Sequence, residues 1–114
     1  MKMLVATLAT AAALVAAPAL AGNVAAGQQK SQVCQACHGP DGNGVGDPQY
    51  PNIAGQYADY LEKTLRDYRD GVRDNAIMAG FAGTLSDQDI RDLAAFYAAQ
   101  SGPLRNMRGS RDAN

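Results

Sequence analysis

The chain has 114 residues, with 10 Lys and Arg against 11 Asp and Glu, so its net charge is −1 when the single histidine is neutral. This weak and mixed charge argues against a nucleic-acid-binding protein, because such proteins usually carry a basic patch. The length allows one small domain with only a marginal core of its own, so a covalent staple or a large apolar ligand would help to stabilise it.

Residues 1–21 have the pattern of a secretory signal peptide. Lys2 precedes an apolar run over residues 4–17, and Ala19-Leu20-Ala21 supplies a small-x-small cleavage site. The run is short and rich in alanine for a membrane span, which needs roughly 20 apolar residues; an uncleaved anchor is the alternative. We therefore expect cleavage after Ala21 and a periplasmic protein that begins at Gly22.

A first helix is expected over residues 24–33, with Asn23 as its N-terminal cap. Gly27 lies inside this helix, where glycine costs about 1 kcal/mol relative to alanine. It either marks the close approach of another backbone or has no special role. Residues 39–55, GPDGNGVGDPQYPNIAG, are too rich in turn-forming residues for a regular element. A loop of this length is usually functional or disordered, and its place directly after the cysteines favours function.

Two further helices follow, one on each side of a second irregular stretch. The first should run from about residue 56 to residue 70, with its inward face formed by Tyr57, Tyr60, Leu61, Thr64, Leu65 and Tyr68. Residues 73–84, which include Met78, are expected to be irregular. A third helix begins at Ser86, with Asp89 in the position of a capping-box partner, and should bury Ile90, Leu93, Ala94, Phe96 and Tyr97. The domain is expected to end at residue 102, and residues 103–114 to form a disordered basic tail.

The stretch CQACHG contains both cysteines of the chain, Cys34 and Cys37, and its only histidine, His38. Four kinds of site could explain it: a disulfide, a zinc site, a redox-active dithiol and a covalently attached haem. A disulfide would close a very small loop and leave His38 unexplained. Zinc requires four ligands, and the chain has no further cysteine or histidine. A thioredoxin-like dithiol sits at the start of a helix among βαβ units, whereas this pair follows a predicted helix.

Covalent haem attachment accounts for every part of the motif. The spacing C-x-x-C-H is typical of c-type haem, in which two cysteine sulfurs bind the macrocycle and the following histidine binds iron from one face. Attachment of this kind takes place outside the cytoplasm, in agreement with the predicted signal peptide. The motif therefore indicates haem c, with its iron, as the cofactor.

A second axial ligand has few candidates in this chain. His38 is the only histidine, and the predicted mature chain has two methionines, Met78 and Met107. Met107 lies in the predicted tail, whereas Met78 lies among small apolar residues just before the third helix. Elimination favours Met78, although a methionine in such surroundings is more often part of a core. Met107 and an open, five-coordinate iron are the alternatives.

Over residues 23–100 the chain resembles class I c-type cytochromes, in particular short monohaem bacterial cytochromes and single domains of related dihaem ones. The resemblance rests on CQACHG, DGNG, YPNIAGQ, a YL-containing helix ending in RDG, the pattern M-x6-LSDQDI and AAFYAAQ. It implies an all-α fold of about three main helices, with long irregular loops wrapped around one covalent haem. It also implies thioether bonds at Cys34 and Cys37, axial ligation by His38 and Met78, and a Pro51 carbonyl that accepts the Nδ1 proton of His38.

The function implied is that of a soluble periplasmic electron carrier, not an enzyme. It would exchange one electron with redox protein donors and acceptors of a respiratory chain, would bind no nucleic acid or small-molecule substrate, and would meet the membrane only through redox partners. One alternative is a fixed cytochrome subunit of a larger dehydrogenase or oxidase. Another is a haem enzyme or sensor with an open iron, for which Arg73 is the nearest candidate for a distal acid–base group.

Overall fold

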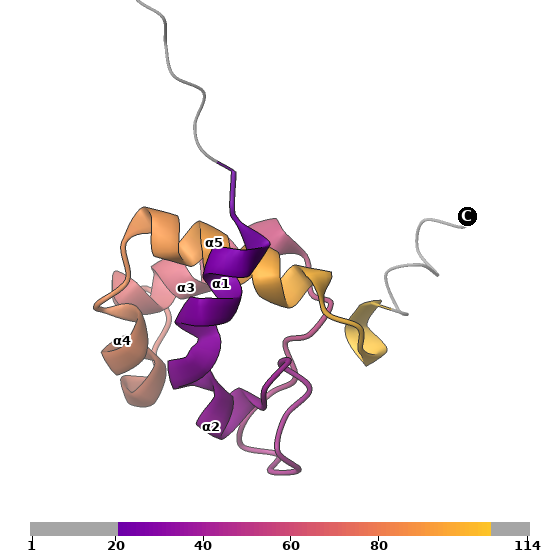
Figure 1. The fold of residues 1–114 in the computed structure, drawn as a ribbon. Coiled ribbons are helices and arrows are strands. Elements are labelled where there is room, and N and C mark those ends of the chain that lie inside the picture. The colour runs from indigo at the N-terminus through magenta and orange to yellow at the C-terminus, as the bar shows by residue number, and fades with distance from the viewer. Residues whose placement is uncertain (1–20, 106–114) are drawn as a thin grey trace, which may run out of the picture.

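The computed structural model describes residues 21–105, which contain helices and no strand. The elements in chain order are α1 (Val24–Lys30), the 3-10 helix η1 (Ser31–Cys34), α2 (Gln35–His38), α3 (Ala58–Arg69), α4 (Ala76–Ala82) and α5 (Asp87–Ala99) (Figure 1). The predicted all-α class is confirmed. No helix within the described range is long and apolar enough to cross a membrane. The predicted signal peptide, apart from Ala21, lies outside the described residues.

The predicted first helix is divided into three short helices. Asn23 caps α1 as expected, since its side chain accepts a hydrogen bond from the backbone N–H of Ala26 at 2.9 Å. The α-helix ends at Lys30 because the chain tightens into η1, where the buried Ser31 hydroxyl donates to the carbonyl of Gln28 at 2.7 Å. Hydroxyl-to-backbone bonds of this kind bend helices.

Helix α1 crosses α5 with their backbones almost in contact (Figure 1). A Cβ atom added at Gly27 would lie 2.0 Å from the carbonyl oxygen of Asp92 and 2.7 Å from Cβ of Phe96. No side chain fits in that space, so Gly27 marks the close approach of another backbone. This crossing fixes the cysteine-bearing segment relative to α5.

Beside the crossing, a buried carboxylate ties the start of α1 to α5. Asp92 is 3% exposed and accepts hydrogen bonds from the backbone N–H of Asn23 at 2.8 Å, from Lys30 Nζ at 2.6 Å and from Gln88 Nε2 at 2.8 Å. Burial by itself would raise the pKa of Asp92, but the hydrogen bonds outweigh it and lower the pKa to about 2. The ionised form of Asp92 therefore stabilises the folded chain.

Replacing Asp92 with asparagine is expected to lower the free energy of unfolding by about 2 kcal/mol at pH 7. The pKa is near 2 in the folded chain and about 3.9 in an unfolded chain. The stabilisation is thus fully present above pH 4, falls to about half at pH 3 and is lost as the pH falls through 2. Chemical denaturation of the wild-type and Asp92→Asn holoproteins at pH 7 and pH 3 checks this. If the two proteins differed in free energy of unfolding by the same amount at both pH values, the prediction would be contradicted. The matched control is Asp74→Asn, which changes an exposed carboxylate.

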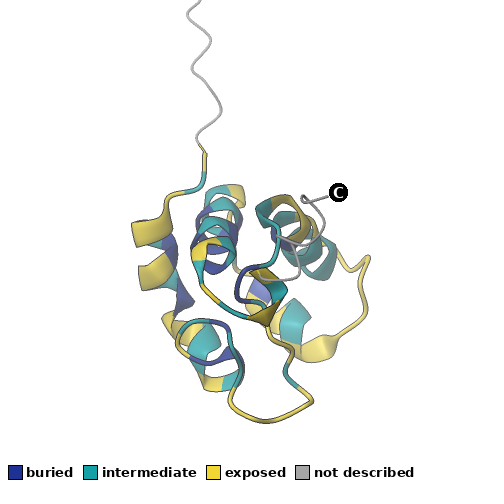
Figure 2. Cartoon of the chain, turned by 90° about the vertical axis from the view of Figure 1, so that its right-hand side faces the viewer, coloured by how far each residue is buried: buried dark blue, intermediate teal, exposed yellow. Residues whose placement is uncertain are grey.

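The predicted extents of the two longer helices are confirmed, but Tyr60, expected on the inward face of α3, is 48% exposed. Helix α3 lies within the expected range, and α5 begins with the predicted capping box: Asp89 N–H donates to Ser86 Oγ at 3.0 Å, and Ser86 N–H donates to Asp89 Oδ2 at 2.9 Å. All five side chains predicted for the inward face of α5 are buried. Figure 2 shows the buried residues gathered on the inward faces of the helices.

Two expectations about irregular segments are wrong. Residues 76–82 are not irregular but form α4, which is capped by the Asn75 side chain through a 3.0 Å bond from the N–H of Met78. This cap starts one short helix of seven residues, whose larger side chains Ile77, Met78 and Phe81 stand at positions i, i+1 and i+4. Residues 103–105, assigned to the disordered tail, are helical, with Arg105 N–H donating to Gly102 O at 3.1 Å. Residues 106–114, including Met107, lie outside the described range.

Candidate cofactor site

The helices and the long loop surround a cavity of about 340 Å³. This volume lies within the range typical of small-molecule and cofactor sites. The cavity has walls from η1 and α2, from the loop before α3, and from α3, α4 and α5. The apolar part of its lining includes Ile53, Leu61, Leu65, Phe81, Leu85, Leu93 and Ala94. Such a lining suits a large, mainly apolar group, which fits the macrocycle implied by the motif.

Cys34, Cys37 and His38 all line this cavity. They stand at positions i, i+3 and i+4 of a helical segment, so their side chains share one face. Both thiols are free and half-buried. Burial raises the pKa of the Cys34 thiol, whereas a redox-active dithiol needs a lowered one. Within residues 21–105 no group of three or more His, Cys, Asp or Glu side chains could hold a metal ion, so the donor set of a zinc site does not occur there.

The His38 imidazole is oriented by the loop. It is 8% exposed, and its Nδ1 lies 2.9 Å from the carbonyl oxygen of Pro51. A carbonyl only accepts hydrogen bonds, so Nδ1 carries the proton and Nε2 keeps a free lone pair. An imidazole held in this way is a prepared metal ligand. The contact is the one that the family resemblance implied for Pro51.

The glycine-rich loop is irregular, as predicted, but fastened at several points. The carbonyl of Gly42 accepts bonds from the N–H groups of Ile53 at 2.8 Å and Ala54 at 3.0 Å, and Gly55 N–H donates to Tyr97 O at 2.8 Å. Gly42 has φ +84°, and a Cβ atom there would lie 2.8 Å from Cδ1 of Tyr97. Glycine is therefore required for the loop to lie against α5. Its fastening to α5 holds Pro51 in place beside His38.

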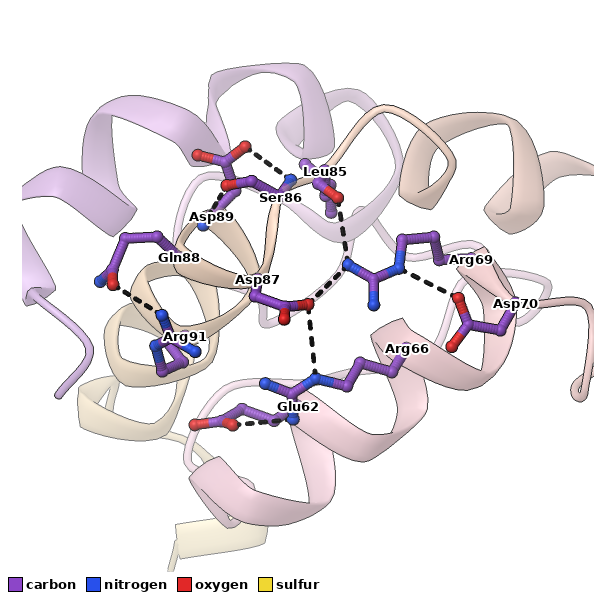
Figure 3. A network of polar contacts seen from close by, with 10 residues as sticks. All are labelled: Glu62, Arg66, Arg69, Asp70, Leu85, Ser86, Asp87, Gln88, Asp89 and Arg91. Atoms are coloured by element: carbon purple, nitrogen blue, oxygen red, sulfur yellow. Dashed lines mark hydrogen bonds and ion pairs between the residues drawn. The ribbon is translucent and has the colours of Figure 1, made fainter. Parts of the chain in front are cut away.

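Met78 lines the same cavity from α4 and is half-buried. Arg69, at the end of α3, joins the two ends of the segment that carries α4. Its guanidinium donates to Leu85 O at 3.3 Å and to Asp87 Oδ1 at 2.8 Å (Figure 3). Arg66 adds a longer contact to Asp87 at 3.9 Å. Each of these ion pairs is at the surface and contributes little stability on its own. Together they fix where the segment bearing Met78 begins and ends.

Two cavity-lining residues had no functional role in the sequence pattern. Tyr97 was predicted only to be buried; it is 4% exposed, and its hydroxyl has no hydrogen-bond partner within the described residues. Burial and the neighbouring Cys34 raise the pKa of Tyr97. Buried hydroxyls normally have a hydrogen-bond partner, so we expect a polar group or atom within the cavity to bond the Tyr97 hydroxyl. Leu104, from the predicted tail, also lines the cavity.

The family model for cytochrome c matches residues 24–99. Cytochrome c-554(548) of Halomonas halodenitrificans is 51% identical over 83 residues, covering 70% of this chain and 99% of that protein. Cytochrome c4 of Pseudomonas aeruginosa is 50% identical over 80 residues, covering 70% of this chain and 39% of that protein. The chain therefore spans nearly the whole of the first relative and less than half of the second.

A solved structure has the same fold. The crystal structure of reduced recombinant cytochrome c4 from Pseudomonas stutzeri matches with a TM-score of 0.68 and 43% sequence identity, covering 72% of this chain and 47% of that one. The part of this chain that folds into the helices and the cavity thus corresponds in size to about half of that structure.

Proposed function

Since the chain belongs to the cytochrome c family and so binds haem c covalently, we propose that it carries one electron. In this proposal the protein is soluble and periplasmic, and the haem iron is ligated by a histidine and a methionine. When bound, haem c supplies an iron that changes between Fe(II) and Fe(III). The observation that carries the proposal is that both cysteines, His38 and Met78 line one apolar cavity. The predicted signal peptide supports export, and with it a periplasmic location.

Each of these side chains has a distinct role in the proposal. Cys34 and Cys37 form the two thioether bonds, and His38 presents Nε2 to the iron while its Nδ1–H stays bonded to Pro51 O. Met78 would supply a thioether sulfur as the second ligand, and a ligand of this kind raises the reduction potential. With both ligands supplied by the protein, His38 and Met78 would not need to rearrange during electron transfer, and no substrate would be needed at the iron.

The partners proposed are redox proteins of a respiratory chain, which donate and accept the electron at the protein surface. The alternative is that the chain is a fixed subunit of a larger dehydrogenase or oxidase. Such a subunit would use the same residues to hold the haem. An enzyme with an open iron is a further alternative, and its candidate acid–base group, Arg73, packs on Tyr68 with its guanidinium carbon 5.1 Å from the ring centroid.

Two measurements on the protein matured in a periplasm test this function. Acid–organic extraction should leave the haem with the polypeptide, because thioether bonds survive unfolding. A potentiometric titration should show one reversible one-electron transition. Haem that passes freely into the organic phase would contradict covalent attachment, and turnover of a small-molecule substrate at the iron would contradict the carrier role.

A further inference from the structure

Residues 101–105 follow α5 and form a strap that lies against the glycine-rich loop. The Asn43 side chain donates a hydrogen bond from Nδ2 to the carbonyl oxygen of Ser101 at 2.9 Å. A Cβ atom added at Gly102 would lie 2.4 Å from Asn43 Oδ1 and 3.2 Å from Cβ of Ala54. The strap and the loop are therefore in direct contact at this end, with no room between them for a side chain on Gly102.

The other end of the strap meets the same loop at Gly55. This glycine has φ +78°, and a Cβ atom there would lie 2.5 Å from Cβ of Arg105 and 2.8 Å from its backbone nitrogen. Arg105 Nη1 also donates a hydrogen bond to the carbonyl oxygen of Ala99, the last residue of α5, at 2.9 Å. The strap is thus fastened to the loop at both ends and to α5 at one of them.

Leu104 lines the cavity from the strap and is half-buried. Its neighbour Arg105 lies on Gly55, which comes shortly after Pro51 in the loop. Pro51 lines the cavity too, and its carbonyl oxygen accepts the Nδ1 proton of His38. The apolar Leu104 side chain therefore closes the cavity next to the loop segment that orients His38.

We propose that Leu104, held by the strap, excludes water from the haem and thereby raises the reduction potential of the iron. This inference rests on the proposed function, since it concerns the same haem. Oxidation adds one positive charge to the haem, and water stabilises that charge, so apolar surroundings favour Fe(II). Solvent access is one of the ways in which the shell around a metal site sets its potential. Leu104 also shields the hydrogen bond between His38 Nδ1 and Pro51 O, so the Nδ1 proton exchanges slowly with water.

Full-length holoproteins with Leu104→Ser and Val24→Ser test this proposal. Both variants replace an apolar side chain with a small polar one, but Val24, at the start of α1 and 46% exposed, is not among the described residues that line the cavity. The measurements are the reduction potential and, by proton NMR of the reduced protein, the rate at which the His38 Nδ1 proton exchanges with water. Leu104→Ser should lower the potential and speed the exchange severalfold, because water enters beside the loop. Val24→Ser should change neither.

Two further variants separate the apolar cover from its fastening. Leu104→Met keeps an apolar side chain of similar volume and should retain the wild-type potential. Asn43→Ala removes the bond to Ser101 without changing a residue of the cavity lining. It should shift the potential and the exchange rate in the same directions as Leu104→Ser, though by less, and it serves as the test if Leu104→Ser does not mature.

Three results would each overturn this inference alone, provided that the wild-type protein has the spectrum of a six-coordinate haem. The first is a wild-type potential and exchange rate in Leu104→Ser, or in Asn43→Ala where that variant serves as the test. The second is an equal change in Leu104→Ser and Val24→Ser. The third is a potential of Leu104→Met as low as that of Leu104→Ser. A wild-type spectrum without six-coordinate ligation would overturn the proposed function first.

Discussion

Replacing both cysteines with alanine is expected to leave the chain largely unfolded. Without thioether bonds the haem is not retained, and the cavity of about 340 Å³ loses its occupant. At roughly 24 cal/mol per Å³ an empty cavity of this size costs about 8 kcal/mol, and less if water enters it. The total stability of a small domain is only about 5–15 kcal/mol. The helices around the site therefore depend on the haem for most of their stability.

Far-ultraviolet circular dichroism and thermal unfolding of Cys34→Ala/Cys37→Ala measure this effect. The control is Gln35→Ala/Ala36→Ser, which changes the two residues between the cysteines and leaves both sulfurs. The control should keep its haem, its helical signal and a cooperative transition. Native-like helix content with cooperative melting in the cysteine variant would show that the protein core is sufficient by itself.

Replacing Met78 with alanine is expected to change the iron's surroundings more than any other single substitution outside the C-x-x-C-H motif. A thioether is a soft donor that favours Fe(II), so its loss should lower the reduction potential. The drop should be on the order of 0.1 V, a fraction of the roughly 0.8 V that haem axial ligands span. The variant should also lose the weak far-red absorbance of ferric iron bound to methionine, and should bind added ligands such as imidazole.

Met107→Ala is the matched control for this experiment. Met107 is the other methionine of the predicted mature chain and belongs to the predicted tail, so its loss should change neither the potential nor the far-red band. A band that survives in Met78→Ala and disappears in Met107→Ala would assign the ligand to Met107. If neither substitution has an effect, the iron has no methionine ligand and an open-iron function becomes the better interpretation.

The elements that could be predicted from the sequence are those with a strong local pattern. Helix α5 has a capping box at its start and apolar residues at regular spacing, and both its start and its five buried residues are confirmed. The motif at Cys34 identified the cofactor because its spacing is short and specific. The class I cytochrome resemblance is confirmed by the family match over residues 24–99.

Features that depend on contacts distant in sequence could not be predicted in the same way. Helix α4 has only seven residues, too few for the spacing of Ile77, Met78 and Phe81 to stand out, so its cap and its place in the fold reveal it. The close approach at Gly27 depends on α5, because the backbone that Gly27 meets belongs to Asp92, 65 residues later in the chain. The position of Arg73 over Tyr68 depends on the chain reversing after α3. Local propensity carries no information about such tertiary contacts.

The most direct test of the proposed function is the optical spectrum of the wild-type holoprotein in its oxidised and reduced states. His38 and Met78 as axial ligands predict a six-coordinate, low-spin haem c in both states, with the far-red band present in the oxidised protein. They also predict that carbon monoxide leaves the spectrum of the reduced protein unchanged. A high-spin oxidised spectrum without the far-red band, together with rapid binding of carbon monoxide, would contradict the assignment.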